Sequence, residues 1–243
     1  MLTVAEIGGV AVAAAVLFAC HGVRADELSA GTADQPVEIE AEPMHSVRLV
    51  NSVVRVYDAL IPPASQTLFH THRYSGVGID ITATRLYIEK VGARPNYETT
   101  KAGDIFPVNA ATPYAHRVAT VGDVAYRAIV AELIQPPRPS SVASTVADTS
   151  PYKLELENER VRVFRLVLQP GQSVPLHTLA ASSLTVAVSG GQISVASRSA
   201  PARFASLAPG ALEWNANAVV VGFKNIGTST YDSVYFEWKS VAP

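Results

Sequence analysis

The chain has 243 residues, with 19 Lys and Arg against 21 Asp and Glu and a formal net charge of -2 at pH 7. That length suits either one large domain or two small ones, each able to bury its own core. Because no stretch is rich in lysine or arginine, the sequence argues against nucleic acid or an anionic membrane surface as a partner, and we expect a small-molecule ligand or substrate.

The N-terminal segment, residues 1–25, is predicted to be a signal peptide. Residues 7–20 are an unbroken run of apolar and glycine residues, which is too short to span a bilayer and has the length of a secretory hydrophobic region. Cleavage after Ala25 would leave a periplasmic or secreted protein. Against this, no Lys or Arg precedes the run. Two alternatives stay open: a lipoprotein attached through Cys20, the single cysteine, and an uncleaved N-terminal anchor or a wrongly assigned start.

Two further segments are predicted to lack a packed core. Residues 26–46 are acidic and poor in large apolar side chains, which predicts a flexible lead-in. Residues 135–151 are rich in proline, serine and threonine and lack aromatic residues, which predicts an interdomain linker. The predicted domains are therefore residues 47–134 and residues 152–243.

The two predicted domains match each other when the second is moved back by 107 residues without a gap. Apolar character is kept at most strand positions, and several residues are identical. The identical pairs include Leu49 with Leu156, Asn51 with Asn158, Val54 with Val161, Arg55 with Arg162, Pro63 with Pro170, His70 with His177 and Gly103 with Gly210. One register held over most of a domain indicates an internal duplication.

Each copy carries the pattern of short β-strands. In the second copy, residues 183–188 alternate between apolar and polar side chains, a glycine turn follows, and residues 192–195 alternate again. Residues 125–133 and 231–238 are predicted to be closing strands, and no amphipathic helix is predicted after the N-terminal segment. This combination predicts an all-β fold, with a sandwich or barrel in each half.

Three histidines of the first copy are candidate metal ligands. His70 and His72 are two residues apart in a predicted strand, so their side chains project from the same face. His116 follows a predicted turn and a further strand, and a neighbouring strand could bring its ring to the same point. Three imidazole nitrogens are a ligand set that metal ions accept in proteins.

The residues around these histidines resemble the two sequence motifs of the cupin superfamily, and the duplication resembles its two-domain members, the bicupins. The first motif is matched by residues 64–72, ASQTLFHTH, and the second by residues 103–116, in which a glycine leads to a proline and then to His116. The second copy keeps the opening glycine of the first motif as Gly171. The resemblance implies two tandem cupin-like barrels of the double-stranded β-helix, or jelly-roll, type, joined by the Pro/Ser-rich linker.

The chain also departs from the cupin motifs. No glutamate stands where cupins usually place a carboxylate ligand, since residues 75–78 are Ser-Gly-Val-Gly, and the spacing from Gly103 to His116 is longer than the common form. The resemblance then implies a divalent ion held by three neutral imidazoles, as in three-histidine cupins such as cysteine dioxygenase. Fe, Zn, Mn, Ni and Cu stay open as its identity. The uncompensated charge of the ion would favour a small anionic organic substrate.

The second copy is expected to lack this site. The ungapped register places Leu179 opposite His72 and Phe223 opposite His116, so His177 alone remains. We expect an apolar interior whose role is packing, dimerisation or binding of an apolar ligand.

Two functions stay open at this stage. The first is a metal-dependent enzyme, dioxygenase-like or isomerase-like, although no general base stands out and no catalytic residue is assigned. The alternative is a non-catalytic small-molecule-binding or structural bicupin without metal, whose histidines are satisfied by hydrogen bonds; in either case the chain could form a homodimer.

Several other side chains receive provisional roles. Arg55 and Arg162 are expected to point outward or to form a structural ion pair, and Trp214 and Trp238 to be core or interface aromatics. His21 and His45 lie outside the predicted barrels and are given no role. Four residues are weaker candidates for lining the first pocket: Tyr74, Arg85, Tyr87 and Tyr114.

Overall fold

The computed structural model describes residues 35–198 and 200–240. The predicted signal peptide, the alternative lipid site at Cys20 and the first part of the predicted lead-in lie outside the described residues. Within the described part, no helix has both the length and the apolar character needed to cross a membrane. Apart from two short 3-10 helices, the regular secondary structure of the described residues is all β-strand, which confirms the predicted all-β class.

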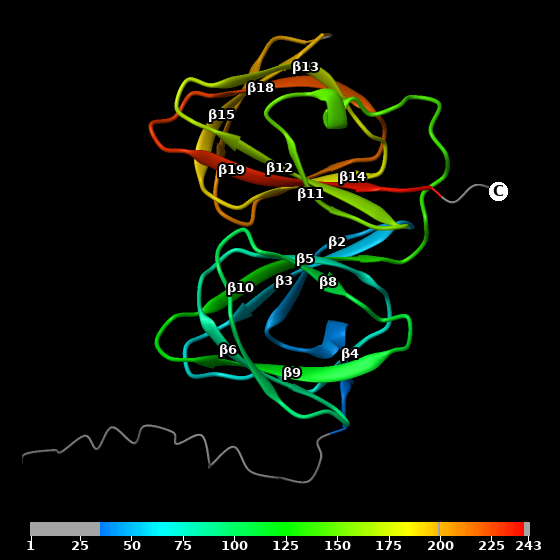
Figure 1. The fold of residues 1–243 in the computed structure, drawn as a ribbon, viewed down its shortest axis with the longest axis vertical. Coiled ribbons are helices and arrows are strands. Elements are labelled where there is room, and N and C mark those ends of the chain that lie inside the picture. The colour runs from blue at the N-terminus through cyan, green and yellow to red at the C-terminus, as the bar shows by residue number, and fades with distance from the viewer. Residues whose placement is uncertain (1–34, 199, 241–243) are drawn as a thin grey trace, which may run out of the picture. The chain divides into compact units, whose positions relative to one another are not determined.

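The first copy forms a barrel from two five-stranded sheets, drawn in blue to green in Figure 1. One sheet has the strand order β1-β4-β9-β6-β7 and the other the order β2-β3-β10-β5-β8. The elements are β1 (Val37–Glu38), the 3-10 helix η2 (Ile39–Ala41), β2 (His45–Val50), β3 (Val54–Ile61), β4 (His70–His72), β5 (Gly76–Asp80), β6 (Arg85–Lys90), β7 (Asn96–Thr99), β8 (Ile105–Val108), β9 (Tyr114–Val121) and β10 (Tyr126–Leu133).

The second copy forms a matching barrel, drawn in green-yellow to red in Figure 1. Its sheets have the orders β11-β12-β19-β14-β17 and β13-β18-β15-β16. The elements are the 3-10 helix η3 (Val146–Asp148), β11 (Lys153–Glu157), β12 (Val161–Leu168), β13 (Ser173–Leu179), β14 (Ser183–Ala187), β15 (Gly191–Ser197), β16 (Arg203–Leu207), β17 (Leu212–Asn215), β18 (Val219–Asn225) and β19 (Tyr231–Trp238).

The strands of the two copies follow the predicted register only as far as β17. Strands β3 and β12 begin at Val54 and Val161, 107 residues apart, whereas β10 and β19 begin at Tyr126 and Tyr231, 105 residues apart. The cause is the connection before β9, which spans residues 109–113, while its counterpart before β18 spans only 216–218. The last two strands of each copy are therefore offset by two residues from the ungapped match.

Alternate side chains of β3 pack into two different apolar clusters. Tyr57 and Ile61 face the interior of the first barrel, while Val54 and Val56 face the other way. The outward-facing valines join an apolar cluster that also contains Val161 and residues of β14 and β19. Both faces of β3 are thus buried along most of its length, and six of its eight residues are apolar. Each fully buried side chain of this kind stabilises the fold by about 1.5–3 kcal/mol.

The shared cluster also accounts for the tryptophans. Trp238 is buried within it, and Trp214 is half-buried and packs against it. Both were expected to be core or interface aromatics, and that expectation is confirmed.

The predicted flexible lead-in is wrong for residues 37–46. Val37 and Glu38 form a parallel strand beside β4, and Ile39 is only 2% exposed. Glu42 is only 1% exposed, and its carboxylate accepts hydrogen bonds from the backbone N–H of Met44 and from the His45 ring. An acidic composition indicates a solvated segment only when its carboxylates lack partners inside the fold.

The predicted linker is partly packed as well. Val146 of η3 is fully buried, and the backbone N–H of Thr145 donates to the carbonyl of Thr178 in β13. The later part of residues 135–151 therefore lies against the second barrel, whereas the sequence predicted a segment that buries little.

Candidate metal centre

His70, His72 and His116 converge inside the first barrel, as their spacing predicts. Strands β4 and β9 are antiparallel neighbours, and His70 lies directly opposite His116 in their register. The ring centroids are 4.6 Å apart for His70 and His116, 4.9 Å for His72 and His116, and 5.3 Å for His70 and His72. One nitrogen from each ring lies within 4.8 Å of the others, a spacing suited to a single ion.

Hydrogen bonds at the outer nitrogens fix the tautomers of two of these rings. His70 Nδ1 lies 3.0 Å from the carbonyl oxygen of Leu68, and His72 Nδ1 lies 2.8 Å from a carboxylate oxygen of Glu132. A carbonyl and a carboxylate accept hydrogen bonds, so each Nδ1 carries the hydrogen, and in the neutral ring each Nε2 keeps a free lone pair. This is the usual arrangement for histidines that bind a metal through Nε2.

The inner Nε2 atoms of the three histidines lie where a metal ion could bind their lone pairs. His70 Nε2 is buried and has no hydrogen-bond partner among the described residues. His72 Nε2 faces His116 Nε2 at 3.0 Å. A buried nitrogen lone pair without a partner costs free energy. The donor set and its geometry therefore fit a divalent ion.

Burial keeps two of these imidazoles neutral, which is their metal-binding form. Desolvation and the nearby ring of His45 lower the pKa of His70 to about 3. Desolvation, together with the neighbouring rings of His70 and His72, holds the pKa of His116 well below its ordinary value. No proton therefore has to leave either ring near pH 7 before an ion binds.

A buried carboxylate stands behind His72. Glu132 is completely buried in β10, and it is held by the guanidinium of Arg55 as well as by His72. The ion-pair alternative for Arg55 is confirmed, whereas outward placement is wrong. Glu132 was not predicted from the sequence. In the second barrel its counterpart Glu237 pairs with Arg162, as Glu132 pairs with Arg55. The signal in the sequence was therefore a glutamate repeated together with the repeated arginine.

A fourth histidine lies beside the cluster. The His45 ring centroid is 4.7 Å from that of His70 and 5.3 Å from that of Tyr57, and its Nδ1 is hydrogen-bonded to Glu42. The expectation that His45 lies outside the barrels is wrong, because His45 is the first residue of β2, pairs with Ala59 of β3 and lines the interior of the first barrel. Its only sequence signal was the glutamate three residues earlier.

The histidines line a cavity of about 520 Å³ inside the first barrel. Of the four weaker candidates, only Tyr114 lines it, and the Tyr114 ring stacks on His72 with centroids 5.1 Å apart. Tyr74 is exposed and lies under the guanidinium of Arg55, while Arg85 and Tyr87 both contact Tyr97. These three do not line the cavity.

The second barrel does not repeat the cluster. In the antiparallel register His177 lies opposite Val221, as His70 lies opposite His116. The predicted counterpart Phe223 is therefore wrong by two residues, because of the shorter loop before β18. His177 donates from Nδ1 to the carbonyl of Pro175 and accepts a hydrogen bond from Tyr152.

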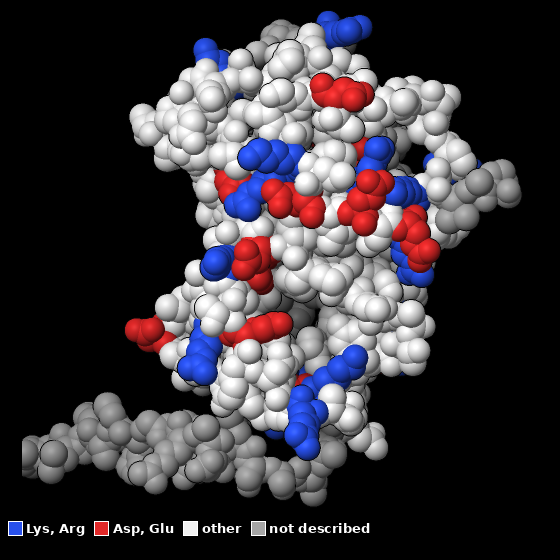
Figure 2. Space-filling model, in the orientation of Figure 1, with Lys and Arg blue, Asp and Glu red and all other residues white. Residues whose placement is uncertain are grey.

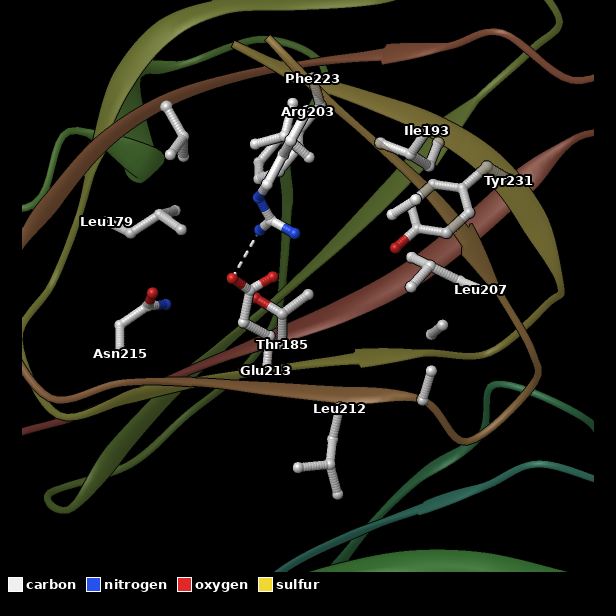
Figure 3. Close-up of a pocket in the computed structure, with 15 residues that line it drawn as sticks. Leu179, Thr185, Ile193, Arg203, Leu207, Leu212, Glu213, Asn215, Phe223 and Tyr231 are labelled. Carbon is white, nitrogen blue, oxygen red and sulfur yellow. Dashed lines mark hydrogen bonds and ion pairs between the residues drawn. The ribbon is translucent and has the colours of Figure 1, made fainter. Parts of the chain in front are cut away.

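An apolar cavity of about 260 Å³ remains in the second barrel, where the sequence predicted an apolar interior. Leu179, Ile193 and Tyr231 are among the side chains that surround it in Figure 3. The exposed ion pair between Arg203 and Glu213, dashed in Figure 3, also lines it. Among the described residues, no second group of three metal-binding side chains is found.

No protein-family model matches the sequence, and no curated protein matches it. Solved structures do share the fold. AerE from Microcystis aeruginosa has a TM-score of 0.56 at 12% identity, covering 81% of this chain and 98% of that chain. A cupin 2 conserved barrel domain protein from Leptotrichia buccalis has a TM-score of 0.50 at 9% identity, covering 88% and 94%. A salicylate 1,2-dioxygenase from Pseudaminobacter salicylatoxidans has a TM-score of 0.51 at 10% identity, covering 76% and 71%.

Proposed function

We propose that this chain, which has the two-barrel cupin fold, binds one divalent metal ion through His70, His72 and His116 and exposes it to a small organic substrate. The observation that carries the proposal is the arrangement of the inner nitrogens. Two tautomers are fixed so that Nε2 lone pairs face one centre, and one of those lone pairs has no other partner among the described residues.

The activity that this site best supports is metal-dependent catalysis, dioxygenase-like or isomerase-like. Three imidazoles leave an ion open positions for water or substrate, and a bound ion would supply Lewis-acid polarisation there. The surrounding chain contributes position and exclusion of water. Glu132 and Leu68 orient two ligands, and the apolar wall of the cavity limits solvent around the reacting group. The resemblance to salicylate 1,2-dioxygenase is one of fold and does not assign that substrate.

The alternative is a binding protein without catalysis. The second barrel favours it in one respect, since that barrel keeps a cavity without a metal-binding set. The substitution His116→Ala separates the two functions. A binding protein keeps its ligand affinity in that variant, whereas a metal-dependent enzyme loses turnover.

Metal content tests the central proposal. The protein, purified without chelators and offered Fe, Zn, Mn, Ni and Cu in turn, should retain about one ion per chain of at least one metal. The double variant His70→Ala, His72→Ala should retain almost none. His177→Ala is the matched control, because it removes a buried barrel histidine from the copy without the cluster, and its metal content should stay at the wild-type level. A wild-type protein that retains no metal near one per chain would contradict the proposal.

Export is a separate proposal. It is supported by the apolar run of residues 7–20 and by the small residue Ala25 ahead of Asp26. N-terminal sequencing of the protein recovered from the periplasm should begin at Asp26, and an acylated N-terminus at Cys20 would support the lipoprotein alternative. Recovery from the cytoplasm with residue 1 intact would contradict export.

A further inference from the structure

The cavity of the first barrel has two polar ends. Tyr126, Ala128, Val130 and Glu132 alternate along β10, and all four are buried. Glu132 contacts His72, while the Tyr126 hydroxyl donates to Asp80 at 2.7 Å. Six residues of strand separate Glu132 from Tyr126, or about 20 Å at about 3.3 Å per residue. Glu132 does not line the cavity, but His72, Tyr126 and Asp80 all do, so the cavity reaches from the histidines to a second polar group.

Three carboxylates form that second group, which we call the acidic end: Asp80, Glu98 and Asp104. All three line the cavity. Asp80 is only 4% exposed, while Glu98 and Asp104 are exposed, so the cavity meets solvent beside the acidic end. None of the described residues that line the cavity is a lysine or an arginine. The acidic end thus has no cationic side chain within the cavity itself.

The buried member of the acidic end is incompletely satisfied. One oxygen of Asp80 accepts the Tyr126 hydroxyl, and its other oxygen accepts no hydrogen bond from any described residue. Burial, with the charges of Asp104 and Glu98 adding to it, raises the pKa of Asp80 to about 7. The guanidinium of Arg165 interacts with Asp104 through its charge, but it donates its own hydrogen bonds to Asp232. A cation entering the cavity would relieve both the repulsion and the missing hydrogen bond.

The wall between the two ends is apolar. Between the histidines and the acidic end the cavity is lined by aliphatic and aromatic side chains from several strands. They include Ala59, Leu86, Val108, Ala128 and Val130. A ligand that fills the cavity therefore needs an apolar middle section, because a polar one would leave buried groups without partners.

We infer that the acidic end binds the ammonium group of a small amine whose apolar body extends toward His70, His72 and His116. The class of ligand is an amine with a second polar group at its opposite end, of which ω-amino carboxylates are the simplest members. This inference rests on the proposed metal site only for the group that meets the histidines. It also refines the expectation of an anionic substrate, since a carboxylate belongs at the ion and a positive charge at the far end.

Matched probes test the inference by calorimetry on the metal-loaded full chain. Straight-chain ω-amino carboxylates, from 4-aminobutanoate to 12-aminododecanoate, are compared with the monocarboxylate and the dicarboxylate of the same length. The best-fitting amino carboxylate should bind about tenfold more tightly than its monocarboxylate, and the dicarboxylate should bind most weakly. Equal binding of the three, or strongest binding of the dicarboxylate, would overturn the inference.

Substitutions locate the effect. In the double variant Asp80→Asn, Glu98→Gln, the tenfold preference for the amine should disappear, while the affinity for the monocarboxylate stays the same. Asp123→Asn removes an exposed carboxylate outside the cavity and should leave the preference intact. Retained metal content shows that each variant is folded. An unchanged preference in the folded double variant would also overturn the inference.

A metal-free arm separates this inference from the proposed function. Hexylamine and hexanol are compared on chelator-treated protein, where only the acidic end distinguishes them. The amine should bind more tightly, and the Asp80→Asn, Glu98→Gln variant should bind the two equally. If the protein retains no metal but still prefers the amine, the metal proposal fails alone. If metal binds at the histidines and the amine preference is absent, the acidic-end inference fails alone.

Discussion

Two hydrogen bonds decide which imidazole nitrogens face the centre of the histidine cluster. The Leu68 carbonyl and the Glu132 carboxylate both accept from Nδ1, so the lone pairs of His70 and His72 point inward. Glu132 and its counterpart Glu237 in the second barrel each pair with an arginine. Glu132 also contacts His72, and Glu237 has no histidine in that place. In the second barrel Leu179 replaces His72, and one oxygen of Glu237 has no partner among the described residues.

The substitution Glu132→Gln tests that role. Glutamine keeps the shape but weakens the acceptor for His72, so metal affinity should fall by about 10- to 100-fold. The measurement is competition with a chelator of known affinity. Glu237→Gln is the matched control, because it removes the equivalent arginine partner without touching a candidate ligand, and its metal affinity should not change. Equal losses in the two variants would show that the ion pair, and not the orientation of His72, is responsible.

The lowered pKa of His70 predicts how acid affects the metal-free protein. Its pKa of about 3 in the folded protein lies below the ordinary histidine value of 6.5, so the unfolded chain binds more protons between these two values. The free energy of unfolding should therefore decrease as the pH falls from about 6.5 toward about 3. Urea denaturation at several pH values measures the slope. His70→Gln removes this titrating group and should flatten the slope, and an equally steep slope in that variant would contradict the assignment.

At the scale of the elements, the sequence predicts the strands better than the connections between them. Period-two alternation and the spacing of His70 and His72 correctly predicted a barrel strand with both rings on one face. The ungapped register failed after β17 because two extra residues lie in the loop before β9, and loop length leaves no periodic signal. The segment from β1 to β2 was missed because its burial depends on tertiary partners of Glu42, which composition does not reveal.

Glu42 should anchor that segment to the barrel. Its carboxylate accepts from the backbone N–H of Met44, from that of Leu68 at 3.3 Å, and from His45. Glu42→Ala leaves buried donors without an acceptor and should lower the free energy of unfolding by about 2–3 kcal/mol. Glu38→Gln is the control in the same segment, since its pair with Arg73 is exposed and its loss should change stability little. Urea denaturation of both variants checks the difference, and equal stabilities would contradict the anchor.

At the scale of the molecule, the two barrels carry equivalent arginine–aspartate ion pairs, and each of these arginines also lies against a glycine of the other barrel. Arg127 pairs with Asp58 in the first barrel, and Arg165 pairs with Asp232 in the second. The aspartate lies on β3 and the arginine on β10 in the first barrel, whereas in the second the arginine lies on β12 and the aspartate on β19. Gly103 and Gly210 have positive φ, and a Cβ at Gly103 would meet the Arg165 guanidinium of the opposite copy. A Cβ at Gly210 would meet Arg127 in the same way. On the face shown in Figure 2, charged side chains of both signs are scattered in small groups.

The shared apolar cluster predicts that the barrels are not independent. Residues 35–134 alone would expose the outward face of β3 and β5, including Val54, Val56 and Val77, which are fully buried in the full chain. We expect this fragment to self-associate or aggregate, because an exposed apolar face of that size is a strong association site. Size-exclusion chromatography with light scattering gives the mass of the fragment. A stable monomeric fragment with undiminished metal affinity would contradict the prediction.

The central claim is that one ion is shared by three imidazoles of the first barrel. X-ray absorption spectroscopy of the metal-loaded full chain tests it most directly. We expect three imidazole nitrogens at about 2.0–2.1 Å from the ion, with the imidazole scattering lost in the His70→Ala, His72→Ala variant. An ion surrounded only by oxygen, or the same spectrum in the variant, would contradict it.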